Sequence, residues 1–349
     1  MLPGNATASG TARYAARFPT HQTVGFYRSA QSLTVCNIGI GTYLGELDEA
    51  TDRGYAESVR AALSDGVNFI DTSLNYRNQR SERSIGTALG QAVEAGNVQR
   101  DEVVICTKAG YLVPDAIPKG AITARDVVGG MHSMAPAFLA DQLDRSRQNL
   151  GIETIDVFYL HNPETQLSYV GQDEFYARIQ QAFIFLEEAV EQGGIQFYGA
   201  ATWEGFRRPA ESSERLSLQR LDEIAREAGG DGHHFRFIQL PVNLAMPQAF
   251  GNRVDGESVL SQAAGLGITV VASASLLQAR LAHNLPSEIR DRLPGAHTDA
   301  QCAIQFARST PGITVALVGM SNAAHVLENL ALANIPPATE EQYLSLYKS

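Results

Sequence analysis

Eight short apolar segments alternate with helical segments along the chain, and this alternation restricts the fold more than any other feature. The apolar segments show little every-second-residue polarity, so each is expected to be covered on both faces, as strands of a parallel sheet are. The predicted strands are residues 37–42, 67–71, 103–107, 155–160, 195–201, 235–240, 268–274 and 313–319. A helical stripe of period 3.6 lies between two of them, at Ile179, Ala182, Phe183, Leu186 and Val190. Such alternation gives either a closed barrel or a doubly wound sheet.

Two observations favour the closed barrel. The number of predicted strands is the eight that a (β/α)8 barrel needs. The glycine pattern of the wound dinucleotide-binding sheet is incomplete, because Gly39 and Gly41 begin it but its third glycine would fall on Leu44. Residues 22–35 are predicted to form a β-hairpin that closes the bottom of the barrel. The chain is therefore expected to be an α/β protein, a TIM barrel with an N-terminal β-hairpin.

The 349 residues are interpreted as one barrel domain, 1–349, because such a barrel needs about 250 residues and long loops account for the rest. Residues 1–21 are predicted to be a flexible N-terminal extension. Two loops are long, residues 109–135 after the third strand and residues 162–175 after the fourth. Loops of this length in a compact domain are usually functional. The sequence leaves open whether the tail from Ile335 folds back over a loop.

Charge and cysteine content exclude several classes of partner. The formal net charge is −11 and the sequence pI is about 5.2, so the basic surface needed to bind nucleic acid or an anionic membrane is missing. The chain has no apolar stretch that resembles a signal peptide or a membrane span. Cys36, Cys106 and Cys302 are far apart and lack a CxxC pair, which favours a reducing compartment and argues against structural zinc. A cytoplasmic protein of unspecified oligomeric state is expected.

Ionisable residues follow three consecutive predicted strands. Asp71 ends the second strand, Lys108 comes directly after the third and His161 directly after the fourth. Active sites of barrels lie at the carboxyl ends of the strands, so these side chains are expected to converge there. Tyr76 follows Asp71 on the same loop. Each of the four alone is commonly structural, as a helix cap, a packing ring, a solvated cation or a satisfied polar group, but their joint placement favours a catalytic set.

This set of side chains suits proton transfer to a carbonyl oxygen. A free phenol has a pKa of about 10 and is a weak acid at neutral pH. Lys108 beside Tyr76 is expected to favour the phenolate and so to lower the pKa of the phenol. Asp71 would keep a buried Lys108 charged. His161 would donate a hydrogen bond to the carbonyl oxygen and orient it.

Four segments of the chain resemble motifs of the aldo-keto reductase superfamily, over about residues 33–332. They are NFIDTSLNYRNQRSERSIG at 68–86, ICTK at 105–108, LGIETIDVFYLHNPE at 150–164 and GMSNAAHVLENL at 319–330. The resemblance implies a metal-free, NAD(P)H-dependent oxidoreductase for an aldehyde, ketone or sugar. It assigns the catalytic tetrad to Asp71, Tyr76, Lys108 and His161, with Tyr76 as the general acid.

The resemblance also implies a set of cofactor contacts, with two departures from the usual pattern. Ala201-Thr202 stands where the family has Ser-Asn, and Ala-Ser-Leu replaces Ser-Pro-Leu around Ser275. The expected contacts are Thr42, Tyr43, Thr202, Gln239, Ser273, Ser275, Leu276, Gln278, Arg280, Gly319, Ser321, His325, Glu328 and Asn329. The cofactor expected is NADP, with NAD possible, because residues 312–334 contain no lysine or arginine.

The same region points to an anion site without any resemblance. A helix is predicted to open near Ser321 after the eighth strand, and barrels often bind phosphate at that place. Ser321 would equally serve as a simple helix cap.

A small-molecule substrate is expected at the mouth of the barrel. The candidate contacts are Tyr43, Tyr111, Asn162, Trp203 and Phe206. The segments HNPE and ATWEGF are more similar to the bacterial sugar-dehydrogenase and channel-β-subunit side of the superfamily than to its steroid reductases.

Three hypotheses stay open beside carbonyl reduction. The first is an aldose or sugar dehydrogenase that works in the oxidative direction. The second is a cofactor-binding regulatory module with little turnover, like the potassium-channel β subunits. The third is another barrel enzyme, such as an isomerase or lyase, which would usually need clustered metal ligands; the adjacent His233 and His234 do not chelate easily.

Overall fold

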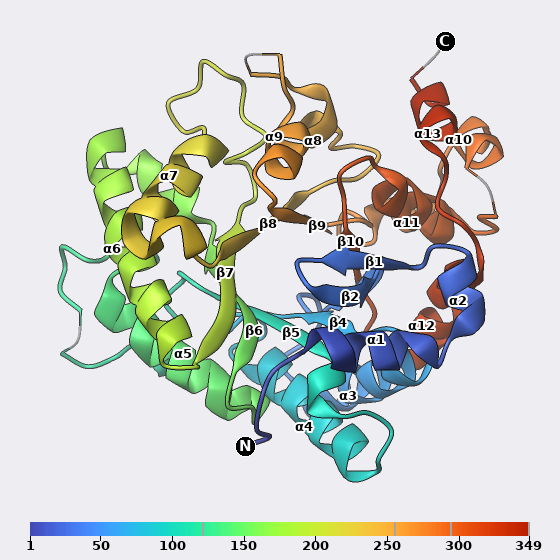
Figure 1. Cartoon of the computed structure of the whole chain (residues 1–349), viewed down its shortest axis with the longest axis horizontal. Helices are drawn as coiled ribbons and strands as arrows, with labels where there is room; N and C mark the ends of the chain where they lie inside the picture. Colours follow the sequence, from blue (N-terminus) through green and yellow to red (C-terminus); the bar gives the residue numbers. More distant parts are fainter. Residues whose placement is uncertain (121, 255, 294, 348–349) are drawn as a thin grey trace.

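A computed structural model of the chain describes residues 1–120, 122–254, 256–293 and 295–347. Eight parallel strands form a closed barrel in the order β10-β3-β4-β5-β6-β7-β8-β9 (Figure 1). The strands are β3 (Ile38–Gly41), β4 (Phe69–Asp71), β5 (Val104–Ala109), β6 (Ile155–His161), β7 (Ile195–Ala201), β8 (Phe235–Pro241), β9 (Thr269–Ser273) and β10 (Val315–Gly319). The predicted (β/α)8 barrel is confirmed, and the ends of its strands lie within two residues of those predicted.

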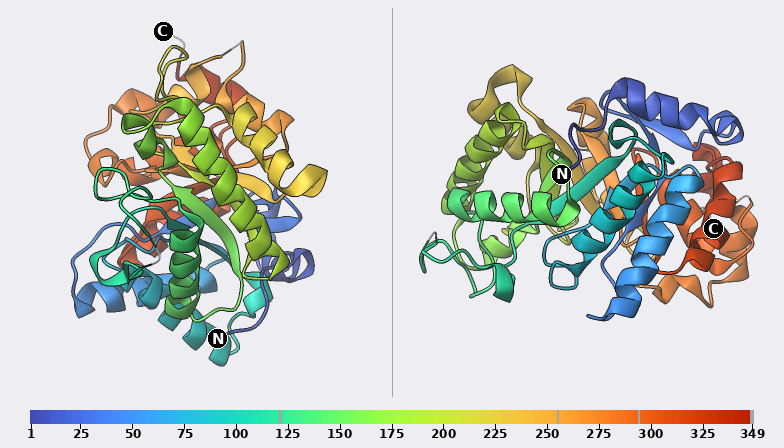
Figure 2. Two further views of the ribbon diagram at one scale, coloured as in Figure 1. Left: turned by 90° about the vertical axis from the view of Figure 1, so that its left-hand side faces the viewer. Right: turned by 90° about the horizontal axis from the view of Figure 1, so that it is seen from below.

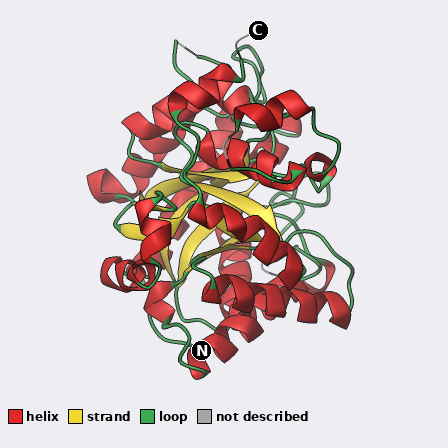
Figure 3. Ribbon diagram, turned by 90° about the vertical axis from the view of Figure 1, so that its right-hand side faces the viewer, coloured by secondary structure: helices red, strands yellow, loops and turns green. Residues whose placement is uncertain are grey.

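The strands are almost entirely buried because helices cover the outside of the barrel (Figure 3). In Figure 2 the green and yellow helices α5, α6 and α7 stand side by side against the sheet. The helices that follow β3 to β10 are α3 (Glu49–Ser64), α4 (Arg80–Glu94), α5 (Pro136–Leu150), α6 (Gln172–Glu191), α7 (Leu218–Gly229), α8 (Gln248–Gly251), α9 (Val259–Gly265), α10 (Ser287–Arg292), α11 (Asp299–Ser309), α12 (Ala323–Leu330) and α13 (Glu340–Ser345). In the part of the chain that is described, none of these helices has the length and apolar character to span a membrane.

A two-stranded hairpin covers the amino-terminal end of the barrel, as predicted. It consists of β1 (Tyr27–Ala30) and β2 (Leu33–Cys36), which pair antiparallel. The Gln31 amide at its turn donates to the backbone oxygen of Gly267 at 2.9 Å, just before β9. Arg28 donates to the backbone oxygen of Ile313 at 2.5 Å, just before β10. Since this end is closed, only the carboxyl ends of the strands are open to a ligand.

The first 21 residues differ from the flexible extension that was expected. They form α1 (Ala8–Ala16) and α2 (Pro19–Thr23), packed beside the hairpin. Tyr14 of α1 is fully buried, and its hydroxyl donates to the backbone oxygens of Leu63 at 2.6 Å and Val67 at 2.9 Å. Thr7 caps the helix by accepting from the Gly10 amide. One buried ring with a satisfied hydroxyl holds the segment on the barrel, so the expectation of flexibility was wrong.

The long loops and the tail lie at the open end or pack against the outer helices. In the loop of residues 109–135, whose residue 121 lies outside the described chain, Tyr111 pairs with His132 through a backbone bridge. The tail after Ile335 does fold back: Tyr343 of α13 is buried against Phe306 of α11, with ring centroids 5.1 Å apart.

Replacing Tyr14 by alanine should destabilise the protein markedly. The change removes a fully buried ring and leaves two backbone oxygens of the α3–β4 connection without their donor. Core aromatic-to-alanine changes cost about 3–5 kcal/mol. Urea unfolding followed by circular dichroism measures the loss. The control is Tyr169→Ala, at a half-exposed ring; equal losses for both variants would mean that α1 does not stabilise the barrel.

Candidate active site

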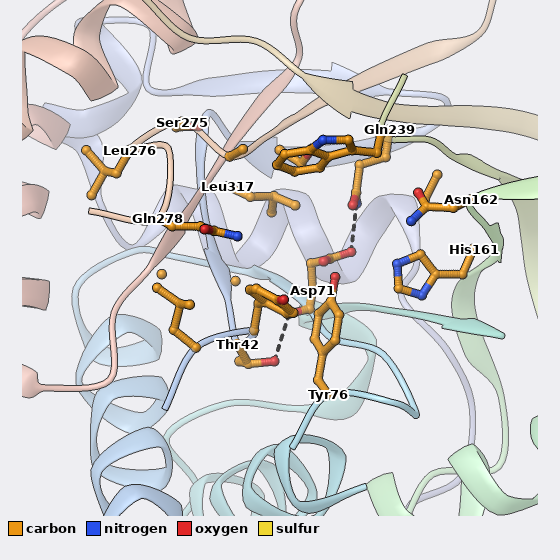
Figure 4. A pocket seen from close by; sticks show the side chains of 18 of the residues that line it. Thr42, Asp71, Tyr76, His161, Asn162, Gln239, Ser275, Leu276, Gln278 and Leu317 are labelled. Carbon is orange, nitrogen blue, oxygen red and sulfur yellow. Dashed lines mark hydrogen bonds between the residues drawn. The ribbon is translucent and has the colours of Figure 1, made fainter. Parts of the chain in front are cut away.

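A cavity of about 410 Å³ opens at the carboxyl ends of the barrel strands (Figure 4). Its walls come from the ends of seven strands and from the loops that follow them. The lining residues are Gly41, Thr42, Tyr43, Leu44, Asp71, Asn75, Tyr76, Tyr111, His161, Asn162, Ala201, Thr202, Trp203, Gln239, Ser273, Ala274, Ser275, Leu276, Gln278, Ala279, Leu317 and Gly319. Three members of the predicted tetrad lie in this wall, and the fourth, Lys108, lies directly behind it.

A buried ion pair forms the floor of the cavity. The ammonium of Lys108 donates to Asp71 Oδ1 at 2.5 Å and to the backbone oxygen of Thr72 at 2.7 Å. The amide of Gln239 donates to Asp71 Oδ2 at 2.9 Å, so both carboxylate oxygens are engaged. Burial alone lowers the pKa of Lys108, but the negative neighbours outweigh it and the pKa is raised above its ordinary value. The side chain is therefore held as a cation in a site with no exposure.

The phenol of Tyr76 lies beside this cation. The Lys108 ammonium is 4.9 Å from the centre of the Tyr76 ring, and Figure 4 shows the hydroxyl directed toward Asp71 and Gln239. Burial raises the pKa of Tyr76, and the charge and hydrogen bonding of Lys108 lower it without cancelling the rise. The expected lowering of this pKa is therefore wrong as the net effect, although Lys108 acts in the predicted direction. Tyr76 is held as a protonated phenol.

The ring of His161 stands next to Tyr76, with centroids 5.7 Å apart. Its Nδ1 lies 3.1 Å from Ser73 Oγ, which leaves Nε2 as the ring nitrogen available to a ligand. Burial, with Lys108 next in effect, lowers the pKa of His161 well below its ordinary value, so the ring is neutral. Ser73 was not predicted, yet it stands in the same loop three residues before Tyr76.

A second histidine supports the first from behind. His132 Nε2 lies 2.8 Å from the backbone oxygen of His161, and burial lowers the pKa of His132 to about 4. The Tyr111 ring packs edge-on between the two histidines, at 5.3 Å from His132 and 5.1 Å from His161. His132 lies in the long loop that length alone marked as functional, but no strand end pointed to it.

A left-handed turn follows Tyr76 and fixes its backbone. Arg77, Asn78 and Gln79 have φ of 49°, 52° and 72°, a conformation that non-glycine residues adopt rarely. Arg77 holds the turn in place, because its buried guanidinium donates to the Glu46 backbone oxygen at 2.8 Å and to Asp52 at 2.7 Å. These contacts tie the Tyr76 loop to the loop that carries Tyr43.

Most of the predicted cofactor contacts line the cavity. Figure 4 places Ser275, Leu276 and Gln278 on the side away from His161. The other predicted contacts that line the cavity are Thr42, Tyr43, Thr202, Gln239, Ser273 and Gly319. Nine of the fourteen predicted cofactor contacts therefore line the cavity.

Several predicted contacts lie outside the cavity. Phe206 was predicted to contact the substrate, and this prediction is wrong. Its side chain is buried in the hydrophobic core and cannot line the mouth of the barrel. Arg280 is exposed beyond the lining residues. The helix α12 begins at Ala323 and is capped by Asn322, so the capping role considered for Ser321 is wrong. Ser321, His325 and Glu328 are exposed on or before α12, and Asn329 is buried in it.

Two polar atoms in the predicted cofactor region have no hydrogen-bond partner among the described residues. Ser275 Oγ is buried in the cavity wall, and Asn329 Oδ1 is buried in α12. The turn that follows Ser275 is left-handed at three consecutive residues, Leu277, Gln278 and Ala279, with φ of 45°, 54° and 67°. Backbone held in this way is typical of ligand-binding loops. These residues fit a nucleotide cofactor laid from the barrel mouth toward α12.

The described part of the chain contains no cluster of side chains suited to bind a metal ion. No group of three or more histidine, cysteine, aspartate or glutamate side chains there is arranged to hold an ion. His234 Nδ1 lies 2.8 Å from Glu187, while His233 lies 3.5 Å from Asp222, so the adjacent histidines face different partners.

Fold and site together define a (β/α)8-barrel protein with a lysine–aspartate pair beneath a tyrosine and a histidine. Residues 37–284 match the model of the Aldo/keto reductase family, so the chain belongs to that family. It is 26% identical over 180 residues to the NADH-specific methylglyoxal reductase of Escherichia coli, and 27% identical over 181 residues to the D-threo-aldose 1-dehydrogenase of a Pseudomonas species. These matches cover 48% and 49% of this chain, and 49% and 51% of the two relatives.

A longer match joins the chain to the 6-dehydroglucose reductase of Novosphingobium aromaticivorans, at 25% identity over 78% of each chain. Among solved structures, the fold is similar to an aldo/keto reductase of Klebsiella pneumoniae in complex with NADP and acetate. The TM-score is 0.63 at 21% identity, over 91% of this chain and 92% of that one. A glycerol dehydrogenase of Gluconobacter oxydans gives a TM-score of 0.67 at 17% identity, over 92% and 93%. Both structural likenesses concern the fold.

Asp71→Asn should destabilise the protein, because it leaves the Lys108 ammonium buried without its counter-ion. Breaking one side of a buried ion pair costs about 3–5 kcal/mol. The loss of stability should be smaller above about pH 9. In the folded variant Lys108 has no counter-ion, so burial lowers its pKa below that of the unfolded chain, and at high pH it becomes neutral and no longer leaves a buried charge unpaired. Urea unfolding at several pH values measures it. Asp141→Asn, in a more exposed pair with Arg145, is the control and should cost under about 1 kcal/mol.

The protein should lose stability as the pH falls below about 6.5, the ordinary histidine pKa. The folded-state pKa of His132 is lowered to about 4, so between these values the unfolded chain binds a proton that the folded chain does not. Each such histidine contributes a slope of up to about 1.4 kcal/mol per pH unit. His132→Gln should flatten the slope in urea unfolding from pH 7 to about 4.5. The exposed His283→Gln is the control; an unchanged slope in His132→Gln would contradict a neutral His132.

Proposed function

We propose that this chain is an NAD(P)H-dependent oxidoreductase that interconverts a carbonyl compound and its alcohol, with Tyr76 as general acid and base. The observation that carries the proposal is the position of the Lys108 ammonium, which is paired with Asp71 and lies 4.9 Å from the centre of the Tyr76 ring in the wall of a cavity. A cation so placed stabilises the phenolate that proton transfer leaves behind. An ion pair that only stabilises the fold does not require a phenol placed between the pair and a cavity, whereas a catalytic one does.

The chain's own residues divide the chemistry among them. Tyr76 gives its proton to the carbonyl oxygen, while Lys108 stabilises the resulting phenolate and Asp71 keeps Lys108 charged. The neutral ring of His161 binds the same oxygen through Nε2 and turns the carbonyl toward Tyr76, provided that this nitrogen carries the proton. The bound cofactor supplies or accepts the hydride.

The cofactor that we propose is NADP(H), with NAD(H) as the alternative to be assayed beside it. Ser275 and Asn329, with their unpartnered buried atoms, and the left-handed turn at 277–279 would hold the dinucleotide. Thr202 would meet the nicotinamide end in place of the usual Ser-Asn pair. The site of action that we propose is the cytoplasm, because the three cysteines are buried and unpaired.

Tyr76→Phe should lower turnover strongly and leave cofactor binding intact. Loss of a general acid lowers the rate by about 10²–10⁴-fold. Absorbance at 340 nm follows NADPH and NADH against a panel of aldehydes, ketones and aldoses, and quenching of protein fluorescence follows cofactor binding. Tyr176→Phe, at a phenol of α6 outside the cavity, is the matched control and should keep wild-type rates.

Two outcomes would overturn the proposal. A rate near that of the wild type in Tyr76→Phe would exclude Tyr76 as the acid. Tight cofactor binding by the wild type without turnover of any carbonyl in the panel would favour the regulatory module instead.

A further inference from the structure

A second cavity, of about 390 Å³, adjoins the first on the side of β6 and β7. Tyr111, Asn162 and Trp203 line both cavities, so they form the boundary between them. Figure 4 shows Asn162 beside His161, on the side away from Leu276 and Gln278. The second cavity therefore extends from the reacting groups in the direction opposite to the proposed cofactor wall. The other residues that line it are Glu164, Thr165, Ser168, Tyr169, Glu204, Arg208 and Glu214.

The boundary between the cavities is built rigidly. Asn162 has φ of 46°, and its backbone N–H donates to the Ala201 backbone oxygen at 2.6 Å. Its side-chain Nδ2 donates to the Tyr111 hydroxyl at 3.0 Å. Glu164 Oε1 accepts the backbone amides of Trp203, at 2.7 Å, and of the next two residues, at 3.0 and 3.2 Å. The β7 loop is thereby fixed on a single carboxylate, with Trp203 held at the boundary.

The lining of the second cavity combines aromatic surfaces with hydroxyl and amide groups. Trp203 and Tyr169 line the cavity and are 38% and 54% exposed, so their rings are accessible to a ligand there. Ser168 and Thr165 bring hydroxyl groups, and Asn162 brings an amide. Aromatic faces beside such groups suit a ligand with many hydroxyls, whose C–H faces pack on rings and whose oxygens exchange hydrogen bonds.

The charges in this cavity argue against an anionic ligand. Its one cation, among the described lining residues, is Arg208, which is already paired with Glu204 at 2.7 Å and with Glu214 at 2.8 Å. Ser168 donates to Glu214 at 3.1 Å and so belongs to the same group. With Glu164 the lining carries three carboxyl groups against one guanidinium. A carboxylate or phosphate on the ligand would meet an excess of negative charge.

We infer that this second cavity is a subsite for the uncharged, polyhydroxylated tail of a sugar-like carbonyl substrate. The inference rests on the proposed function, since the carbonyl carbon of that substrate lies between Tyr76 and His161. A three-carbon aldehyde fits within the first cavity and leaves the subsite empty. A six-carbon chain reaches past the boundary, where its hydroxyls meet Asn162, Ser168 and the Arg208 group. A six-carbon chain that ends in a carboxylate is disfavoured.

Kinetics on three substrates test the subsite: glyceraldehyde, D-glucose and D-glucuronate. Ser168→Phe fills the second cavity and should lower kcat/KM for glucose relative to glyceraldehyde by roughly tenfold or more. The fraction of each sugar in open-chain form cancels when variants are compared. Ser287→Phe is the matched control, because Ser287 is an exposed serine at the start of α10 that also bonds a neighbouring glutamate. It should leave the ratio unchanged.

The double variant E204Q/E214Q removes both carboxylate partners of Arg208. It should raise kcat/KM for glucuronate relative to kcat/KM for glucose by roughly tenfold. The control E223Q/E227Q makes the same change around Arg220, an exposed arginine of α7 that is also paired with two glutamates. Glyceraldehyde turnover should stay constant in all four variants. Unchanged ratios in both S168F and E204Q/E214Q, with glyceraldehyde still reduced, would overturn the subsite and leave the proposed function standing.

A binding measurement keeps the inference testable if turnover is absent. Trp203 is the only tryptophan of the chain, so its emission reports directly on the boundary of the subsite. Sorbitol, an uncharged polyol, should change the Trp203 emission saturably in the wild type and only weakly in S168F. Gluconate, which carries a carboxylate, should change this emission only in E204Q/E214Q. Equal responses to sorbitol and gluconate in all variants would overturn the inference. Loss of turnover with an intact sorbitol response would count against the proposed function alone.

Discussion

The buried pair of Lys108 and Asp71 is the interaction on which the rest of the site depends. An ammonium without exposure is stable only when a counter-ion and hydrogen bonds replace its water, and Asp71, Thr72 and Gln239 provide them. Adjacent parallel strands place the pair, because β4 ends at Asp71 opposite Cys106, and β5 continues for three residues past Cys106, the second of which is Lys108. The charge of Lys108 in turn limits how far burial raises the pKa of Tyr76, and it adds to the burial that keeps His161 neutral.

The ion pair lies beneath the open end of the barrel, and two adjoining cavities occupy that end. The hairpin and α1 close the amino-terminal end, so ligands enter only where the strands finish. The loop after β9 and the end of β10 form the proposed cofactor wall, and loops after β6 and β7 form the second cavity. Both the Tyr76 loop and the cofactor loop contain left-handed turns without glycine, which surrounding contacts such as those of Arg77 hold in place.

The strands and the tetrad were predictable because both follow from local pattern: apolar runs mark strands buried on both faces, and polar residues at their ends stand out. Loop residues were less predictable. Phe206 was placed at the mouth because of its distance from β7, but the loop folds it into the core. The helical packing of Tyr14 and the net pKa of Tyr76 depend on burial, which a motif does not report. One signal was overlooked: the chain has only three lysines among 27 basic residues, so a lysine directly after an apolar strand was conspicuous.

That scarcity of lysine makes the central claim directly measurable. In protein labelled with ¹³C,¹⁵N-lysine, the side-chain shifts of Lys108 can be followed by NMR from pH 6 to 11, with exposed Lys119 as the internal reference. The predicted result is that Lys108 stays protonated beyond the pH at which Lys119 titrates, since its pKa is raised. A Lys108 that loses its proton before Lys119 would contradict the account, because no cation would then stand beside the Tyr76 phenol.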